Sequence, residues 1–407
     1  MLRSNKQNIS LILLLCNVFI AFLGIGLVVP VLPAYMNELN LSGVYMGYLI
    51  AAFSTAQLFS SPVTGIFTDR FGRKIMIVIG LVLFAVSEFL FAIGSAFFLL
   101  LISRIIGGIS AACIMPAVTA FITDITALED RPKALGYLSA SINAGFIIGP
   151  GIGGFAAEFG IRVPFFLAAF IALVAAVFSI LLLKEPLPND NIQQLDEKQT
   201  RLQFFSELSK SIKPPYVVPL LIVFVLAFGL SAYETMFGLF VDKKFGFSPK
   251  DISIIITTGT IFGLIAQIVF FDKLVKYLGE KRLIEICLLG ASVFIFLSTL
   301  VDGYFFIMAV TFAVFLACDL LRPAVTTLLS NMAGDEQGFI AGMNSTYTSL
   351  GNIVGPAIAG ILFDIDVDFP YVLASIVLLL AFMMAALWPF RDNMEQKKEK
   401  FLMERIY

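Results

Sequence analysis

Long apolar stretches, separated by short polar segments, make up most of the chain. A helix that crosses a membrane needs about 20 mainly apolar residues, and these stretches are of that length. The pattern predicts twelve membrane-spanning helices, near residues 9–35, 44–68, 75–94, 98–121, 134–158, 164–183, 215–241, 250–271, 283–301, 304–329, 339–363 and 370–390. The first stretch contains Pro30 and Pro33 and exceeds the apolar core of a signal peptide, about 7–15 residues, so we expect it to be retained.

The composition supports an all-α integral membrane protein. Of the 407 residues, 59% are hydrophobic and 14% are charged, whereas soluble proteins have about 45–50% apolar and about 25% charged residues. The net charge of −2 gives no indication of nucleic-acid binding. The four cysteines lie in apolar stretches without metal-ligand spacing, and histidine is absent, so a proton relay would have to use carboxylates or water.

Basic residues are concentrated in one set of loops. They cluster near the N-terminus, in the 70–74, 131–133 and 273–282 loops, in the 184–214 connector and in the tail after residue 390. The opposite side has only Arg162, Lys243, Lys244 and Lys250. Because cytoplasmic loops collect Lys and Arg, we expect a multi-pass protein of the cell membrane with both termini in the cytoplasm.

The two halves of the chain repeat each other. The segment GFIIGPGIGG at 145–154 corresponds to GNIVGPAIAG at 351–360, an offset of 206 (351 − 145). We therefore expect an N-terminal six-helix bundle over 1–183, a cytoplasmic linker over 184–214, and a C-terminal six-helix bundle with a tail over 215–407. A parallel duplication of six helices is typical of secondary transporters.

The loop between the second and third predicted helices reads GIFTDRFGRK. It resembles the signature loop of the major facilitator superfamily, which implies that fold, with twelve helices in two six-helix bundles. The residues that carry the resemblance, and that we expect to form a cytoplasmic gate, are Gly65, Asp69, Arg70, Gly72, Arg73 and Lys74. Asp69 is expected to accept hydrogen bonds at a neighbouring helix N-terminus and to pair with basic groups of the other bundle. A loop that only sets topology would contain the same basic residues.

The fifth predicted helix resembles the antiporter motif that is found mainly in exporters of this superfamily. The resemblance rests on Gly145, Gly149, Pro150, Gly151, Gly153 and Gly154. Small residues also permit an ordinary tight contact between helices, and this alternative stays open. Over essentially the whole chain, with FGLSAYETMFGLF (228–240) among the best matches, the sequence is similar to Gram-positive multidrug efflux pumps of the Bmr, Blt and NorA type, the Blt type most closely.

Two carboxylates lie deep in predicted helices, Glu234 in the seventh and Asp319 in the tenth. A charge at such depth costs at least ~2.5–3.5 kcal/mol on insertion scales, which makes both residues functional candidates. Arg322 can share a helix face with Asp319, so a local ion pair is the alternative for Asp319, whereas Glu234 has no base nearby in the sequence. The resemblance implies that these three residues and Arg104 serve proton coupling and cation binding. Glu88 sits late in its helix, and we expect it at the membrane edge or at a loop cap.

A pocket for ligands of varied shape needs broad apolar and aromatic walls with few fixed polar groups. The candidates are Phe22, Ile25, Gln57, Asn143, Phe146, Tyr233, Phe237, Phe315, Asn344, Tyr347 and Asn352. Any one of the 42 phenylalanines is more often a core or lipid-facing residue, so the polar candidates are the stronger ones.

These observations favour a proton-coupled exporter of small amphipathic, mainly cationic compounds that works by alternating access. Polyamines such as spermidine are a natural cargo that the resemblance implies. We expect no cofactor, the proton gradient as energy source, the lipid bilayer as partner, and a functional monomer. The alternatives are an importer or symporter of the same superfamily, a channel, and a membrane enzyme; no Ser/His/Asp set is possible without histidine.

Overall fold

The computed structural model describes residues 5–185, 210–211, 216–333 and 336–388. These residues form helices, turns and loops, without β-strands. Twelve helices are long and apolar enough to cross a membrane, which confirms the predicted number and the all-α class. Only a helix of this kind satisfies every backbone N–H and C=O within one segment when no water is near, which is why the apolar stretches fold in this way.

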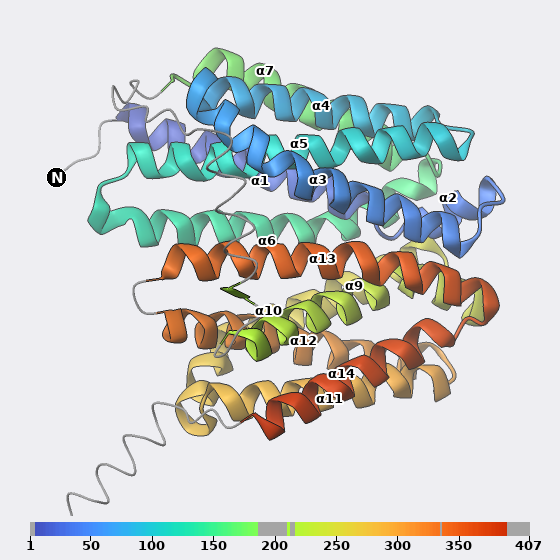
Figure 1. Cartoon of the computed structure of the whole chain (residues 1–407). Coiled ribbons are helices and arrows are strands. Elements are labelled where there is room, and N and C mark those ends of the chain that lie inside the picture. Colours follow the sequence, from blue (N-terminus) through green and yellow to red (C-terminus); the bar gives the residue numbers. More distant parts are fainter. Residues whose placement is uncertain (1–4, 186–209, 212–215, 334–335, 389–407) are drawn as a thin grey trace, which may run out of the picture. The chain divides into compact units, whose positions relative to one another are not determined.

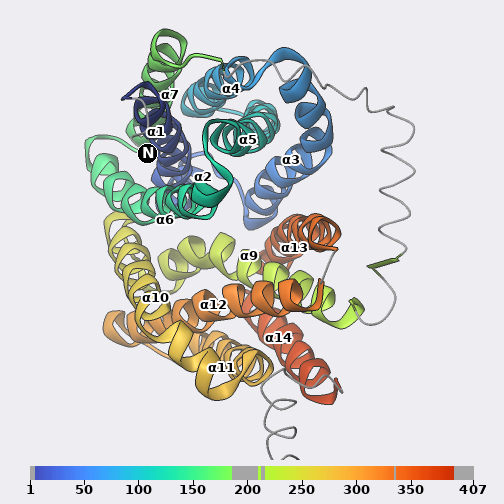
Figure 2. The ribbon, with the colours of Figure 1, turned by 90° about the vertical axis from the view of Figure 1, so that its left-hand side faces the viewer.

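The first half of the chain forms seven helices and two short 3₁₀ turns. The helices are α1 (Asn5–Val28), α2 (Leu32–Glu38), α3 (Gly43–Phe71), α4 (Arg73–Ile93), α5 (Phe97–Ile125), α6 (Arg131–Ala156) and α7 (Val163–Leu182). The 3₁₀ turns η1 (Leu128–Asp130) and η2 (Ala157–Phe159) flank α6. Figure 1 shows α4, α5 and α7 running side by side, and the end-on view in Figure 2 places α5 among α1, α3 and α4.

The second half forms six long helices over its described residues. They are α9 (Val217–Phe245), α10 (Pro249–Leu278), α11 (Glu280–Leu300), α12 (Tyr304–Ala333), α13 (Gln337–Ile365) and α14 (Phe369–Leu387). Within this half α11 packs against both α12 and α14.

The first predicted span is wrong in one respect. A single helix was expected over 9–35, but α1 ends at Val28 and the separate short helix α2 begins at Leu32. Proline lacks a backbone N–H and its ring clashes with the preceding helical turn, so Pro30 stops α1. Pro33 stands in the first turn of α2, where the missing N–H costs nothing.

The chain divides into two compact units. The first comprises residues 1–194, 235–257 and 359–367, and the second comprises 195–234, 258–358 and 368–407. The ends of α9, α10 and α13 thus pack with helices from the first half: the backbone N–H groups of Gly43 and Val44 donate to the Asp364 carboxylate at 2.8 and 3.1 Å. The predicted boundaries of the two six-helix bundles stay a prediction.

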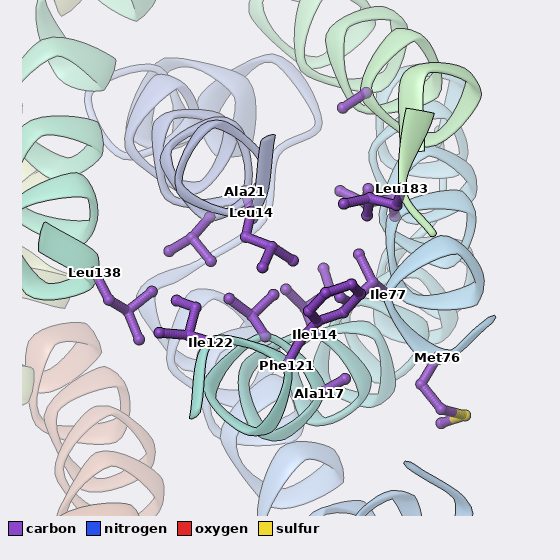
Figure 3. Packing of buried hydrophobic residues seen from close by; sticks show 14 of the residues in the cluster. Leu14, Ala21, Met76, Ile77, Ile114, Ala117, Phe121, Ile122, Leu138 and Leu183 are labelled. Atoms are coloured by element: carbon purple, nitrogen blue, oxygen red, sulfur yellow. The ribbon is translucent and has the colours of Figure 1, made fainter. Parts of the chain in front are cut away.

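The first unit has a continuous apolar core between α1, α4, α5, α6 and the end of α7. Figure 3 shows its side chains meeting between the helices, with Phe121 of α5 near the centre of the group. The residues labelled there are Leu14, Ala21, Met76, Ile77, Ile114, Ala117, Phe121, Ile122, Leu138 and Leu183. These side chains fill the space between the helices, so the buried polar residues of the first unit are surrounded by a tightly packed apolar interior.

Candidate functional site

Glu234 of α9 and Arg322 of α12 form an ion pair, with Nη2 of Arg322 3.7 Å from Oε1 of Glu234. Both side chains are open to solvent, at 44% and 56% exposure respectively. A helix face turned outward would also expose the residues three and four positions away, yet Leu230, Phe237 and Gly238 are buried. Glu234 is therefore an exposed carboxylate on a largely buried stretch of α9.

This pairing adds to the local one considered for Asp319, since Arg322 also interacts electrostatically with Asp319. Arg322 forms its ion pair with Glu234, on another helix, so the acid that lacked a base nearby in the sequence has one in the structure. Asp319 is half-buried on α12, and its carboxylate lies against the backbone of Gly263 on α10. The second unit thus gathers two carboxylates and one arginine from α9 and α12.

Glu88 and Arg104 form a second arginine–carboxylate pair, between α4 and α5. Their Oε1 and Nη2 atoms are 3.2 Å apart, with side-chain exposures of only 2% and 10%. The Arg104 guanidinium also stacks on Phe91, 4.0 Å from the ring centroid. The expectation that Glu88 lies at the membrane edge or caps a loop is wrong, because this carboxylate is buried and neutralises Arg104.

Two serines brace the same helix pair. The Ser87 hydroxyl donates to the Ser103 carbonyl and the Ser103 hydroxyl donates to the Ser87 carbonyl, both at 2.8 Å. The reciprocal bonds fix the register of α4 against α5 next to Glu88 and Arg104. Such a hydrogen-bonded polar cluster inside an apolar bundle favours one arrangement of its partners.

The predicted gate loop is organised around Arg73, the first residue of α4. Its guanidinium contacts Asp69 at 3.1 Å and Asp124, near the end of α5, at 3.0 Å. The acid that accepts the backbone N–H groups of Arg73 and Lys74 is Glu185, at 2.6 and 2.9 Å. Glu185 and not Asp69 therefore caps α4, and the pairing of Asp69 with the other bundle stays a prediction.

The remaining loop residues serve the turn between α3 and α4. Gly72 has φ +102°, a conformation that other residues rarely adopt. Lys74 donates to the Ile180 carbonyl at 2.7 Å, while Arg70 is exposed beside Phe71 and Gly65 has open space around it. Gly279 in the second half has φ +82° and precedes Lys281, which donates to the Trp388 carbonyl at 2.7 Å. The turn between α10 and α11 thus has the same positive-φ glycine and the same kind of lysine contact as the turn between α3 and α4.

The glycine run of α6 has two packing faces. Gly145, Gly149 and Gly153 lie against the α1 backbone: a Cβ built on Gly149 would be 2.8 Å from the Gly26 Cα. Gly151 and Gly154 face α10 in the first unit, where a Cβ on Gly154 would be 2.9 Å from the Pro249 carbonyl. Pro150 is buried within the same helix. Both faces are close backbone contacts, so the tight-contact alternative describes the geometry, and the antiporter role stays a prediction.

The predicted pocket residues fall in both units. Phe22 and Phe146 make an edge-to-face ring contact at 4.9 Å. Tyr233 is buried and its hydroxyl donates to Thr311 at 3.2 Å, and the Tyr347 hydroxyl lies 3.0 Å from Ser211. Of the others, Phe237 and Phe315 are buried, Ile25, Gln57, Asn344 and Asn352 are half-buried, and Asn143 is exposed. That these residues line one pocket stays a prediction.

A surface cluster joins the end of the linker to the start of α13. Lys210 pairs with Glu336, and the Tyr216 hydroxyl donates to the same carboxylate at 3.0 Å. The hydrogen bonds from Lys210 and Tyr216 lower the pKa of Glu336 below its usual range. Both members of this pair are exposed, unlike Glu88 and Arg104.

The Major Facilitator Superfamily sequence model matches residues 14–248 and 219–405, which together span nearly the whole chain. The chain belongs to this superfamily. With its twelve apolar helices, it is a multi-pass membrane protein.

Two proteins of Bacillus subtilis (strain 168) are similar over almost their full length. Multidrug resistance protein 2 is 53% identical over 96% of this chain and 97% of its own, and multidrug resistance protein 1 is 53% identical over 94% and 97%. The quinolone resistance protein NorA of Staphylococcus aureus is 45% identical over 91% of this chain and 93% of its own.

Solved structures share the fold. A bacterial homologue of the human lysosomal transporter Spinster, inward-facing and unoccupied, aligns with a TM-score of 0.78 at 15% identity, covering 95% of this chain and 97% of its own. The nucleoside transporter NupG aligns with a TM-score of 0.76 at 15% identity, covering 95% and 100%. At this identity the comparison establishes the fold alone.

Proposed function

We propose that this protein is a proton-coupled exporter of small amphipathic, mainly cationic compounds. The observation that carries the proposal is the open ion pair of Glu234 and Arg322, with Asp319 one helical turn before Arg322. An ionisable group within a membrane-spanning helix is a functional candidate by default, and this pair is accessible to solvent. The names of the similar proteins, which refer to multidrug and quinolone resistance, support a drug as substrate.

The chemistry is an exchange at the carboxylates. A cationic substrate needs the negative charge of Glu234 or Asp319, and a proton on the same carboxylate removes that charge. Proton and substrate therefore compete for one site. A proton that arrives from outside displaces the substrate outward, and its release to the cytoplasm restores the site for the next substrate molecule.

Two carboxylates give room for two protons in each cycle. One proton exchanged for one monovalent cation moves no net charge, so only the pH gradient drives export, about 1.4 kcal/mol per tenfold ratio. A second proton would add the membrane potential, roughly 2.3 kcal/mol per charge per 100 mV. The two-proton cycle supports steeper accumulation and depends on voltage.

Substrate uptake into energised, inside-out vesicles tests the proposal, because export from the cell corresponds to uptake into such vesicles. With an imposed pH gradient, ethidium and spermidine should accumulate in vesicles that contain the wild-type protein, and Glu234→Gln should abolish this accumulation. Glu285→Gln is the matched control, since Glu285 pairs with Lys281 at 3.7 Å at the start of α11. Accumulation that is equal in wild type and Glu234→Gln, or flux in the opposite direction, would contradict export by this site.

The proposal also covers the oligomeric state, membrane location and orientation of the transporter. It acts as a monomer in the cell membrane with both termini in the cytoplasm, and it needs no cofactor beyond the proton gradient. Spermidine is included among the substrates because the resemblance to pumps of the Blt type implies a polyamine cargo, and its ammonium groups can form charged hydrogen bonds with the carboxylates. Labelling of single cysteines introduced into the tail and into the Gly246 turn tests the orientation.

A further inference from the structure

Two glycines of α10 face α12 one helical turn apart. A Cβ built on Gly259 would lie 2.7 Å from Cδ2 of Phe315, and one built on Gly263 would lie 2.9 Å from Cγ of Asp319. Both distances are below those of real Cβ contacts. The absence of side chains on this face therefore permits the side chains of α12 to rest on the α10 backbone.

The Asp319 carboxylate occupies the space that a side chain at residue 263 would need. The neighbours Cys318, Leu320 and Leu321 are buried, so the α12 backbone has little freedom to withdraw. Any larger residue at 263 must be accommodated by rotation of Asp319 itself. Gly263 consequently decides where this carboxylate points.

The position of this carboxylate matters because of the charges around it. Glu234 and Asp319 contribute −1 each and Arg322 contributes +1, so the cluster has a formal charge of −1. Arg322 pairs with Glu234 and also interacts electrostatically with Asp319, so its one positive charge offsets only one of the two carboxylates and one negative charge of the cluster is left for a ligand. A monovalent organic cation would neutralise the cluster.

We propose that Gly263 is a positioning residue that selects substrates by charge. By leaving room for the carboxylate against α10, it keeps Asp319 as a separate anion beside the Glu234–Arg322 pair. This inference rests on the proposed function, since it assigns the preference for cations to the same site. A Cβ at residue 263 moves the anion and weakens cation binding while the transport cycle for uncharged compounds continues.

The test compares Gly263→Ala with Gly290→Ala in proteoliposomes. Gly290 is the matched control, because its Cβ would meet Ala317 of α12 at an ordinary 3.9 Å. In Gly263→Ala the KM for ethidium should rise by about tenfold with the maximal rate retained, the loss expected when a charged partner is displaced. Gly290→Ala should keep the wild-type KM, and transport of an uncharged dye should be unchanged in both variants.

Asp319→Asn separates positioning from a general packing effect. If Gly263 acts through the carboxylate, Gly263→Ala should cause no further rise in KM in the Asp319→Asn background. A wild-type KM in Gly263→Ala, or additive effects in the double variant, would overturn the inference about Gly263. Neither result would contradict the proposal that the wild type exports substrates in exchange for protons. Identical ethidium transport in Asp319→Asn and wild type would instead remove Asp319 from the proposed site.

Discussion

Two arginine–carboxylate pairs of the same chemistry differ in their surroundings. Glu88 and Arg104 are sealed between α4 and α5, with a ring stacked on the arginine and two serines bonded beside them. Glu234 and Arg322, between α9 and α12, are further apart and exposed. The first pair has a fixed geometry, and the second is free to change partners.

The difference in burial bears on which charges we propose for transport. A buried pair has already lost its hydration, so separating its members leaves an isolated charge in an apolar interior, which is strongly unfavourable. An exposed pair exchanges its partner for water, a proton or an organic cation at small cost. Burial favours a structural role for Glu88 and Arg104, the proton-coupling role expected of Arg104 stays a prediction, and we propose Glu234 and Arg322 for exchange.

The largest effect is expected from Arg104→Met. Removing one member of a buried pair typically costs about 3–5 kcal/mol, because the other charge stays buried and unpaired. Thermal unfolding of the purified protein in detergent should show this loss as a large fall in the transition midpoint.

The double variant Glu88→Gln with Arg104→Met is the control for that experiment. Replacing both charges is often nearly neutral, so most of the lost stability should return. If Arg104→Met unfolds at the wild-type temperature, the sealed pair has no structural role and the comparison fails.

Unlike Arg104→Met, Glu234→Gln should change stability little and transport strongly. Exposed pairs contribute about 0–1 kcal/mol, so the unfolding midpoint should stay close to that of the wild type. Proton-driven export should nevertheless fall by about tenfold or more, since the exchanging carboxylate is gone. Parallel unfolding and vesicle assays check this, and a destabilisation as large as that of Arg104→Met would show that the two pairs are equivalent.

A smaller effect is expected when the positive member of the open pair is removed. Arg322→Gln changes the formal charge of the cluster from −1 to −2, so ethidium should bind about fivefold more tightly, as expected for roughly 1 kcal/mol of electrostatic interaction. Fluorescence titration of the purified protein measures this, with Lys276→Gln, at an exposed position of α10, as control. Unchanged or weaker binding would mean that Arg322 does not compete with the substrate.

The smallest effect is expected when Glu336, which pairs with Lys210 at the surface, is replaced. Because the folded-state pKa of Glu336 is lowered, its contribution to stability is present above the pKa of the unfolded state and is lost as the pH falls through the folded value. Below about pH 4.5 the unfolding midpoint of Glu336→Gln should therefore fall slightly less steeply with decreasing pH than that of the wild type. Identical profiles for wild type and variant down to pH 3 would contradict this.

Helix positions followed from the sequence because membrane-spanning length is a strong constraint. The break between α1 and α2 also has a visible cause in the sequence, because Pro30 prevents the helix from continuing through its position. The buried pair left a signal too: α4 and α5 are joined by a turn at 94–96, Ser87 and Ser103 are centred on 95, and Glu88 and Arg104 are the next residue of each helix. Residues equally distant from such a turn meet, so this register could have paired Glu88 with Arg104.

Other parts of the site had no comparable signal. Glu234 and Arg322 lie on helices that are not consecutive, so no turn relates them in the sequence. The contact between Gly263 and Asp319 depends on how closely α10 approaches α12, which apolar periodicity does not specify. The cap from Glu185 likewise depends on where α7 ends in space, so the choice between Glu185 and Asp69 needed coordinates.

That cap has a consequence for any attempt to separate the halves of the protein. Glu185 lies two residues beyond Leu183, the last residue of the apolar stretch that ends the first half, yet it satisfies the first backbone N–H groups of α4. A gene fragment cut at the edge of that stretch would leave this helix start without its acceptor. Co-expressed halves should therefore assemble better when the break falls after Glu185 than when it falls after Leu183.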